Sequence, residues 1–363
     1  MWTAPFSLES AFPAGLLGLL LAAVPACAGP VPVVVETVLR PTADTVVAPF
    51  GDIAGAVWVA DRRWVVLAPQ DRAVSLADFD RHTLRRFGAA TELSQPYHLF
   101  RSGDSVLVDD WLRRRLTAWS LDGTRRGTVP AVAALRGALP RARDVSGRWY
   151  FELPPPAGSD GTGNLDSAAI ARTAADFGGV DTVGRLAPTD LVEVMSEGRH
   201  RLERRLLSGQ DRWGVLPDGA VWIARIVDNR VDWRASDGRR IQGRPLPDRV
   251  LPITQNDRDI FLSHFEAALR PTVEQTPFAI IKPPFEDAAA APDGAVWLTK
   301  NRAVGDTIRE YQIIDREGRL VGTAHHPGLG RLLALGGGYA LVGEPFAGGV
   351  RLLLFQLEAP PGA

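Results

Sequence analysis

The residues of this chain best suited to chemistry are seven charged or imidazole side chains spread along most of its length. They fall, one or two at a time, in short segments ahead of recurring hydrophobic strands, and they are Asp52, His98, Asp144, Arg212, Glu286, Asp287 and Arg331. Carboxylates bind divalent cations such as calcium, and arginines bind carboxylates. If the fold brings these segments together, the sequence predicts a polar ligand site, with Asp52 and Glu286 as the candidate metal ligands. The alternative is that each of these side chains is individually solvated or structural.

Established catalytic motifs are absent from the sequence. It contains no Gly-x-Ser-x-Gly elbow, no His-Glu-x-x-His zinc motif and no glycine-rich phosphate loop. Its single cysteine, Cys27, excludes an intrachain disulfide framework. The formal net charge is -1, with 41 basic and 42 acidic residues, so nothing in the charge balance favours nucleic acid as a partner.

A repeated unit of a turn and a strand indicates how the polar segments are positioned. Residues 291–299 read Ala-Pro-Asp-Gly-Ala-Val-Trp-Leu-Thr, and residues 216–224 repeat this almost unchanged, with a weaker third copy at 53–60. Pro-Asp-Gly predicts a tight turn, and the Val-Trp run predicts a buried strand. We expect Trp58, Trp222 and Trp297 to occupy equivalent positions and to pack between adjacent sheets. Such units cannot bury their own faces, so their recurrence predicts small sheets closed around an axis.

These patterns predict an all-β fold, a six-bladed β-propeller of four-stranded antiparallel blades. The hydrophobic run 31–39 is expected to pair with residues 351–357 and so to close the ring with an N-terminal strand. A helix that starts after Thr254 and ends at Pro271 is expected as an insert between blades four and five, and residues 190–207 as an outer strand after blade three. The innermost strands, which would line a central channel, are expected at 50–53, 97–100, 141–145, 212–215, 285–288 and 331–334.

The predicted second blade contains a sequence pattern that resembles a known repeat. Residues 105–123 contain a hydrophobic strand ending in Asp110, then Arg115, then an aromatic strand ending in Asp-Gly, and this resembles the NHL repeat. In that family the residues at the positions of Asp110 and Arg115 are mostly structural, because they tie one strand to the next. Most of residues 31–357 resembles bacterial six-bladed propellers of the NHL and TolB-like type. The resemblance implies the fold and leaves the activity open, because many members are exported proteins of unknown role.

The N-terminus predicts export. Residues 12–26 form an apolar run that ends in small residues, which is typical of a secretory signal covering residues 1–27, followed by a single domain at 28–363. Cys27 directly follows Val24-Pro25-Ala26, an arrangement that resembles a lipoprotein signal. Lipidation of Cys27 and simple cleavage both remain open. The protein is thus expected to be periplasmic or lipid-anchored in the cell envelope, with the anchor as its only membrane contact.

Two functions are compatible with these residues. The first is an exported binding or scaffolding module for a protein, a peptide or a cell-envelope component. The second is an enzyme that resembles the metal-dependent lactonases, a hydrolase using Glu286, Asp52 and His98 at the mouth of the central channel, where such enzymes bind calcium or zinc. The proposed inner positions contain no asparagine, which departs from the lactonase pattern. The loop 154–164 is a candidate lid or binding loop, or else a mobile hairpin tip.

Overall fold

The computed structural model describes residues 34–88, 91–155, 167–196 and 198–357. The predicted signal, Cys27 and residues 156–164 of the long loop lie outside these described residues, so those predictions stay open. No helix within the described ranges is long and apolar enough to cross a membrane.

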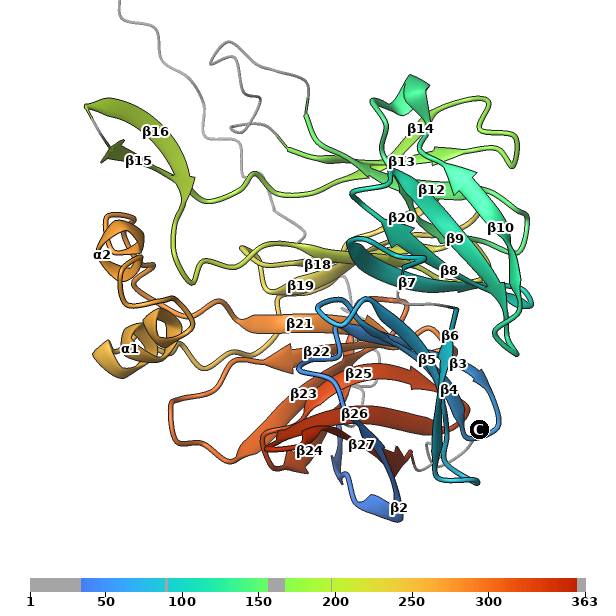
Figure 1. The fold of residues 1–363 in the computed structure, drawn as a ribbon. Helices are drawn as coiled ribbons and strands as arrows, with labels where there is room; N and C mark the ends of the chain where they lie inside the picture. Colours follow the sequence, from blue (N-terminus) through green and yellow to red (C-terminus); the bar gives the residue numbers. More distant parts are fainter. Residues whose placement is uncertain (1–33, 89–90, 156–166, 197, 358–363) are drawn as a thin grey trace, which may run out of the picture. The chain divides into compact units, whose positions relative to one another are not determined.

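Six antiparallel sheets confirm the six-bladed β-propeller (Figure 1). Blade one contains β3 (Gly55–Ala60), β4 (Arg63–Ala68), β5 (Ala73–Asp78) and β6 (Thr83–Phe87). Blade two contains β7 (Pro96–Ser102), β8 (Ser105–Asp110), β9 (Arg115–Ser120) and β10 (Arg125–Pro130). After the short 3-10 helix η1 (Ala133–Leu135), blade three contains β11 (Pro140–Arg143), β12 (Trp149–Leu153), β13 (Ala169–Thr173) and β14 (Asp181–Arg185).

The other three blades follow the same order from the inner to the outer strand. Blade four contains β17 (Arg212–Val215), β18 (Val221–Arg225), β19 (Arg230–Arg234) and β20 (Arg240–Ile241). Blade five contains β21 (Phe285–Ala290), β22 (Val296–Lys300), β23 (Ile308–Ile314) and β24 (Leu320–Pro327). Blade six contains β25 (Arg331–Gly336), β26 (Tyr339–Phe346), β27 (Gly349–Gln356) and β2 (Pro41–Ala48).

The six innermost strands form the centre of the propeller. Each one contacts the next, in the order β3, β7, β11, β17, β21, β25 and back to β3. Because the chain enters every blade at its inner strand, all six inner strands run in the same direction along the central channel. We call the end of the channel where they begin the first mouth, and the end where they finish the second mouth. Five of the six inner segments match the sequence prediction. In blade one the prediction was wrong, because residues 50–53 precede the inner strand β3.

The N-terminal strands differ from the prediction. Strand β1 (Val35–Val38) adds in parallel to β24 of blade five, and β2 pairs antiparallel with β27 of blade six. The hydrophobic run was therefore assigned to the wrong blade, since residues 41–48, not 31–39, pair with the C-terminal strand. Val46 and Ala48 of β2 are buried in the core, whereas Val35 and Val38 are exposed. A run of β-branched residues predicted a strand but not its burial.

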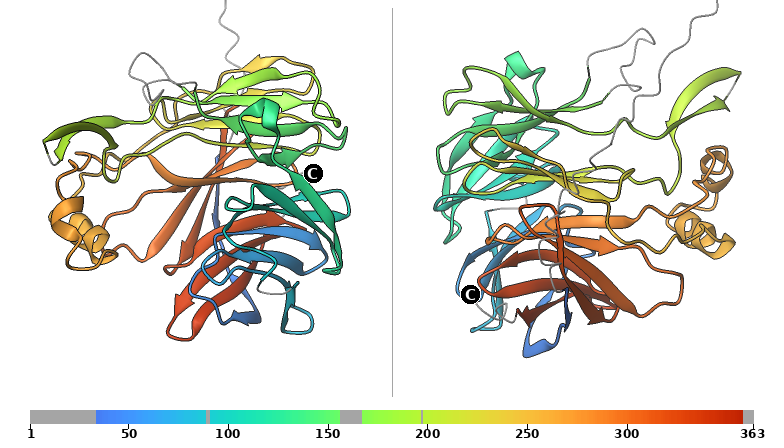
Figure 2. Two further views of the ribbon diagram at one scale, coloured as in Figure 1. Left: turned by 45° about the horizontal axis from the view of Figure 1, so that its top comes forward. Right: turned by 180° about the vertical axis from the view of Figure 1, so that it is seen from behind.

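Two inserts depart from the blade pattern. Strands β15 (Leu191–Ser196) and β16 (Arg199–Arg204) pair only with each other among the described strands, so they form a separate hairpin and not the expected outer strand. Helices α1 (Gln255–Ser263) and α2 (Arg270–Val273) separate blades four and five in the sequence. The views of Figures 1 and 2 agree that these helices and the hairpin lie on the same side of the sheets.

The helical insert begins as predicted and ends earlier. Thr254 caps α1 through a capping box, in which its side chain accepts a hydrogen bond from the Asp257 backbone and the Asp257 carboxylate accepts one from the Thr254 backbone. The helix then ends at Ser263. Pro271 lies in the first turn of α2 and does not end α1, a position where proline is favoured because its missing N–H has no helical partner.

The core lies between neighbouring blades. Trp64 of β4 packs with Leu341 and Leu352 of blade six, and Trp222 belongs to a cluster between blades four and five. Trp222 and Trp297 lie on second strands, whereas Trp58 lies on the inner strand β3. The third copy of the repeat is therefore not equivalent to the other two. It lacks the Pro-Asp-Gly turn that precedes a second strand in the other copies.

Candidate functional site

Six of the seven predicted site residues lie at the first mouth, but they do not form one cluster. Asp52 lies in the loop before β3, His98 lies near the start of β7, and Arg331 is the first residue of β25. Arg212 is the first residue of β17, and Glu286 and Asp287 follow the first residue of β21. The seventh, Asp144, follows the end of β11 and so lies at the second mouth.

Asp144 is part of a buried group that we call the Asp144 clasp, consisting of Asp144, Arg148 and Tyr150. The Asp144 carboxylate accepts hydrogen bonds from the Arg148 backbone N–H (3.0 Å), from Arg148 Nε (2.7 Å) and from the Tyr150 hydroxyl (2.8 Å). The Tyr150 hydroxyl also lies 3.3 Å from the Gly219 carbonyl in the turn of blade four. Burial, together with the Asp144 carboxylate, raises the pKa of Tyr150 to about 12. The clasp therefore joins blades three and four.

Arginines at the first mouth connect neighbouring blades. Arg331 donates a hydrogen bond to the Ile53 carbonyl, and its Nη2 lies 3.7 Å from Asp52 Oδ1. Arg212 donates to the Glu286 carbonyl (3.2 Å), and its Nε lies 3.3 Å from Asp287 Oδ1. These pairs link blade six to blade one and blade four to blade five. They are partly exposed, so each contributes little to stability by itself.

The two candidate metal ligands lie in different blades. Asp52 belongs to blade one and Glu286 to blade five, with blade six between them, and Glu286 forms an ion pair with Arg309. In the described part of the chain, no group of three or more His, Cys, Asp or Glu side chains could hold a metal ion. Calcium binding therefore remains a prediction.

A β-bulge positions His98. The pairing of β7 with β8 passes from Pro96–Asp110 to Leu99–Val108, so Tyr97 and His98 together oppose the single residue Asp109. The buried Asp109 carboxylate accepts hydrogen bonds from the backbone N–H groups of both residues, and it lies 3.0 Å from His98 Nδ1. Sequence reasoning missed Asp109. The sequence feature that could have indicated Asp109 is the Asp-Asp pair at the end of the hydrophobic run 105–110.

The bulge opens into a pocket of about 460 Å³ at the first mouth, which we call the blade-two pocket. Two of its aromatic side chains are mostly in solvent, Tyr97 at 64% and Trp111 at 58% exposure. Arg114 lies 5.9 Å from the Trp111 ring centre. Its other lining residues include His98, Asp109, Leu135, Arg136, Arg141 and Glu152.

The opposite wall of the blade-two pocket is fixed by charged contacts. Arg141 forms an ion pair with Glu152 at 2.8 Å, and the Trp213 indole N–H donates to the same carboxylate at 2.7 Å. Arg141 also lies in a bulge of its strand. The pocket thus presents aromatic faces beside polar groups that are already held in place, which suits the binding of a ligand with both apolar and polar parts.

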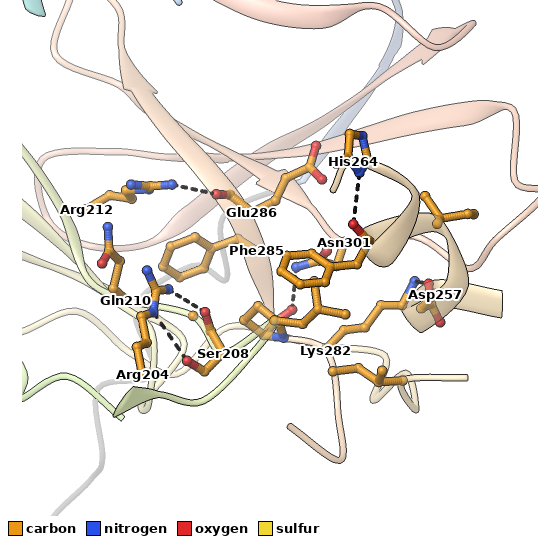
Figure 3. A pocket seen from close by; sticks show the side chains of 16 residues that line it. Arg204, Ser208, Gln210, Arg212, Asp257, His264, Lys282, Phe285, Glu286 and Asn301 are labelled. Atoms are coloured by element: carbon orange, nitrogen blue, oxygen red, sulfur yellow. Dashed lines mark hydrogen bonds and ion pairs between the residues drawn. The ribbon is translucent and has the colours of Figure 1, made fainter. Parts of the chain in front are cut away.

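A second pocket, which we call the insert pocket, has a volume of about 400 Å³ (Figure 3). It lies between helix α1 and the starts of β17 and β21. Figure 3 shows Arg204, Gln210 and Arg212 on one side of it. Asp257, in α1, and His264, the C-cap of α1, lie on the other side. Of the residues predicted from sequence, Arg212 and Glu286 line this pocket.

Comparison with known proteins defines the class of protein. No protein-family profile and no curated protein sequence matches this chain. Among solved structures, a Bacteroides fragilis protein provisionally described as exported is similar at 9% identity, with 90% of this chain and 100% of that chain covered and a TM-score of 0.51. At this identity the likeness shows the fold alone, a six-bladed β-propeller.

Two enzymatic or metal-binding propellers are similar at lower TM-scores. A gluconolactonase from Xanthomonas campestris is 13% identical over 90% of this chain and 99% of that chain, with a TM-score of 0.47. Regucalcin from Agrobacterium tumefaciens, described as calcium-binding, is 11% identical over 91% and 99%, with a TM-score of 0.44. Neither likeness carries an argument about activity.

Proposed function

We propose that this propeller is a binding module that recognises a protein or peptide at the blade-two pocket. The observation that carries the proposal is the exposure of Tyr97 and Trp111 beside Arg114 at one pocket. Tryptophan, tyrosine and arginine are the residue types that dominate binding energy at protein interfaces. Large aromatic side chains are usually removed from water, so two exposed ones at one pocket favour a surface that a partner covers.

The surroundings of these aromatic residues also support binding. Leu112, next to Trp111 in the turn between β8 and β9, is 69% exposed and extends the apolar surface. The Arg114 side chain is held by a hydrogen bond to the Gly137 carbonyl (3.0 Å), and the Tyr97 ring packs edge-on against His98. Side chains held in place before binding lose less conformational entropy when a partner arrives.

The test starts from peptides selected on the purified protein from a random display library. We expect Trp111→Ala to weaken binding of a selected peptide by about thirtyfold or more, as for a hot-spot residue, and Tyr97→Ala by about tenfold. Phe346→Ala is the matched control, because Phe346 is an exposed aromatic residue of blade six. Fluorescence anisotropy measures the affinities. Failure to select any peptide, or equal affinity for Trp111→Ala and the wild type, would contradict the proposal.

A second candidate function, metal-dependent hydrolysis, is favoured by one observation at the same pocket. The His98 imidazole is oriented by the Asp109 carboxylate, the arrangement in which a histidine acts as a general base. Lactone hydrolysis by the purified protein, measured with added calcium and then with a chelator, tests this function. Activity that disappears in His98→Ala would support it, and no hydrolysis under either condition would exclude it for the lactones used.

We also propose that the protein is exported, and that its kinship lies with NHL and TolB-like propellers. The buried Asp110 carboxylate supports the kinship, because it accepts hydrogen bonds from the Ser94 and Gln95 backbone and so ties strand β8 to the start of blade two. Mass spectrometry of the protein from membranes and from the soluble fraction tests export. Lipidation at Cys27 should appear as an acyl-modified N-terminus that is lost in Cys27→Ala.

A further inference from the structure

The insert pocket contains two arginines that lie close enough to repel each other. Arg204 ends strand β16, and Arg212 begins strand β17. Arg212 has a carboxylate partner in Asp287. Arg204 donates only to Ser208, through Nε to the hydroxyl (3.4 Å) and through Nη2 to the carbonyl, and no carboxylate in the described ranges lies within ion-pair distance of it.

The carboxylates of the insert pocket are already engaged. Asp257 Oδ1 lies 2.5 Å from Lys282 Nζ, and Asp257 Oδ2 accepts hydrogen bonds from Thr254. Glu286 is paired with Arg309. The pocket therefore has a cationic side at Arg204, and the carboxylate that acts on this guanidinium from a distance, Asp190, is itself paired with Arg205. An arginine guanidinium binds a carboxylate through parallel hydrogen bonds.

The remaining wall of the insert pocket is partly apolar, and its polar members Lys282 and Asn301 already donate to backbone carbonyls. Phe285 and Ile253 line the pocket and are almost fully buried, at 1% and 7% exposure. Phe261 of helix α1 packs against Phe265 and lines the opposite side. A ligand bound here would meet charge at one end and aromatic or aliphatic surface along its length.

The helix that forms this wall is fixed to the propeller. The Ala279 backbone N–H donates to the Leu206 carbonyl (2.9 Å), and the Lys282 backbone N–H donates to the Leu251 carbonyl (2.8 Å). The Lys282–Asp257 ion pair, with both side chains largely buried, joins the first turn of α1 to the segment before β21. The insert pocket therefore exists before a ligand binds, and its volume of about 400 Å³ falls within the range of roughly 300–1,000 Å³ of small-molecule sites.

We propose that the insert pocket binds an organic anion with one carboxylate and an apolar body. Arg204 and Arg212 bind the carboxylate, and the apolar body lies between Phe285 and Phe261. This site is separate from the blade-two pocket and goes beyond the proposed recognition of a protein or peptide. No covalent step is involved, so the ligand is bound and released unchanged.

The electrostatics of Arg204 agree with such a ligand. Arg204 is an exposed residue whose guanidinium is partly desolvated. Desolvation and the nearby Arg212 lower the pKa of Arg204, against the opposing effect of Asp190. A bound anion between the two guanidinium groups would replace this repulsion with attraction.

Octanoate is the probe for the test, with octan-1-ol and acetate as the two comparison ligands. Octan-1-ol keeps the apolar chain without the charge, and acetate keeps the charge without the chain. Isothermal titration calorimetry should show saturable octanoate binding, with binding of each comparison ligand weaker by about tenfold or more. Octan-1-ol loses the charge-assisted contact, and acetate loses the burial of the apolar chain.

Variants then locate the site. Arg204→Gln and Arg212→Gln should each weaken octanoate binding by about tenfold. Ile260 of α1 also lines the pocket, so Ile260→Asp should weaken binding by placing a carboxylate beside the ligand. Arg240→Gln is the control, because Arg240 is an exposed arginine on β20. Circular dichroism shows that each variant is folded, and Trp111→Ala should leave octanoate binding unchanged. Absence of saturable binding, or wild-type affinity in both arginine variants, would overturn the proposal.

Discussion

Asp144 offers the sharpest test of how this ring is held together. The sequence suggested a channel-lining ligand residue, whereas the structure places the side chain in the Asp144 clasp, with none of its surface exposed. Replacing Asp144 with alanine removes the acceptor for the Tyr150 hydroxyl and for two donors of Arg148. We therefore expect Asp144→Ala to lower the free energy of unfolding and to leave ligand binding at the first mouth unchanged.

The expected magnitude follows from the contacts of the carboxylate. Loss of a hydrogen bond to a charged group costs about 1.5–3 kcal/mol, and a neutral donor left without its acceptor costs about 1–3 kcal/mol. Two features reduce the total. The Arg148 side chain is 29% exposed and can reach water, and the Tyr150 hydroxyl keeps the Gly219 carbonyl at 3.3 Å. We expect a loss of about 3 kcal/mol for Asp144→Ala, and about 1 kcal/mol for Tyr150→Phe.

Urea unfolding followed by tryptophan fluorescence measures both losses. Since the two side chains share a hydrogen bond, the double variant should be less destabilised than the sum of the single variants, by at least about 0.5 kcal/mol. A loss under about 1 kcal/mol for Asp144→Ala would refute the structural role. The structural role would also be refuted if Asp144→Ala kept its stability but bound a selected peptide or octanoate more weakly.

Three further predictions concern the clasp, the buried tyrosines and the helical insert. Gly219→Ala should destabilise the protein by at least about 2 kcal/mol in urea, because Gly219 has φ 86° and a Cβ there would lie 2.4 Å from the clasp arginine. Burial raises the pKa of Tyr150 and of Tyr311 to about 12, above the ordinary value of about 10. Because these phenols lose their protons first in the unfolded chain, the free energy of unfolding is unaffected by them below about pH 10 and falls as the pH rises to about 12. Phenolate absorbance should show this late ionisation, and Tyr150→Phe should remove half of it. Although burial opposes the shift, Lys282 and Thr254 lower the pKa of Asp257. The stability that the Asp257 carboxylate contributes is therefore present above about pH 4 and is lost as the pH falls further. Asp257→Ala should expose residues 254–283 to limited proteolysis at neutral pH, and equal protease resistance would contradict this.

Much of the fold could be predicted because its signals are local. The Asp-Gly turns at Asp218 and Asp293 each accept a backbone hydrogen bond two residues on, and each precedes a strand found close to where it was expected. Hydrophobic runs predicted most strands in the same way. The signal fails where a strand lacks its turn, as at Trp58, and where pairing joins distant parts of the chain, as for β1 and β2.

The candidate sites could be predicted only in part, because bulges and contacts between blades are not local. The inner strands of blades two, three and five each contain a bulge near the first mouth, and these determine where His98, Arg141 and Glu286 lie. Arg204 was missed because its hairpin was assigned to blade three. The apolar pair Trp111-Leu112, which follows the Asp-Asp end of a strand, was a usable signal for an exposed surface.

The pairing of the N-terminal strands with blades five and six has a consequence for how the chain folds. Residues 35–48 lack their partner strands until residues 320–356 have been synthesised, so these contacts have very high sequence separation. High contact order slows folding, because loop closure precedes any gain from pairing. The first four blades can form their own sheets early, while blade six can only be completed last. A circular permutant with new ends in the loop between blades three and four would make those contacts local, and it should refold faster if this closure limits the rate.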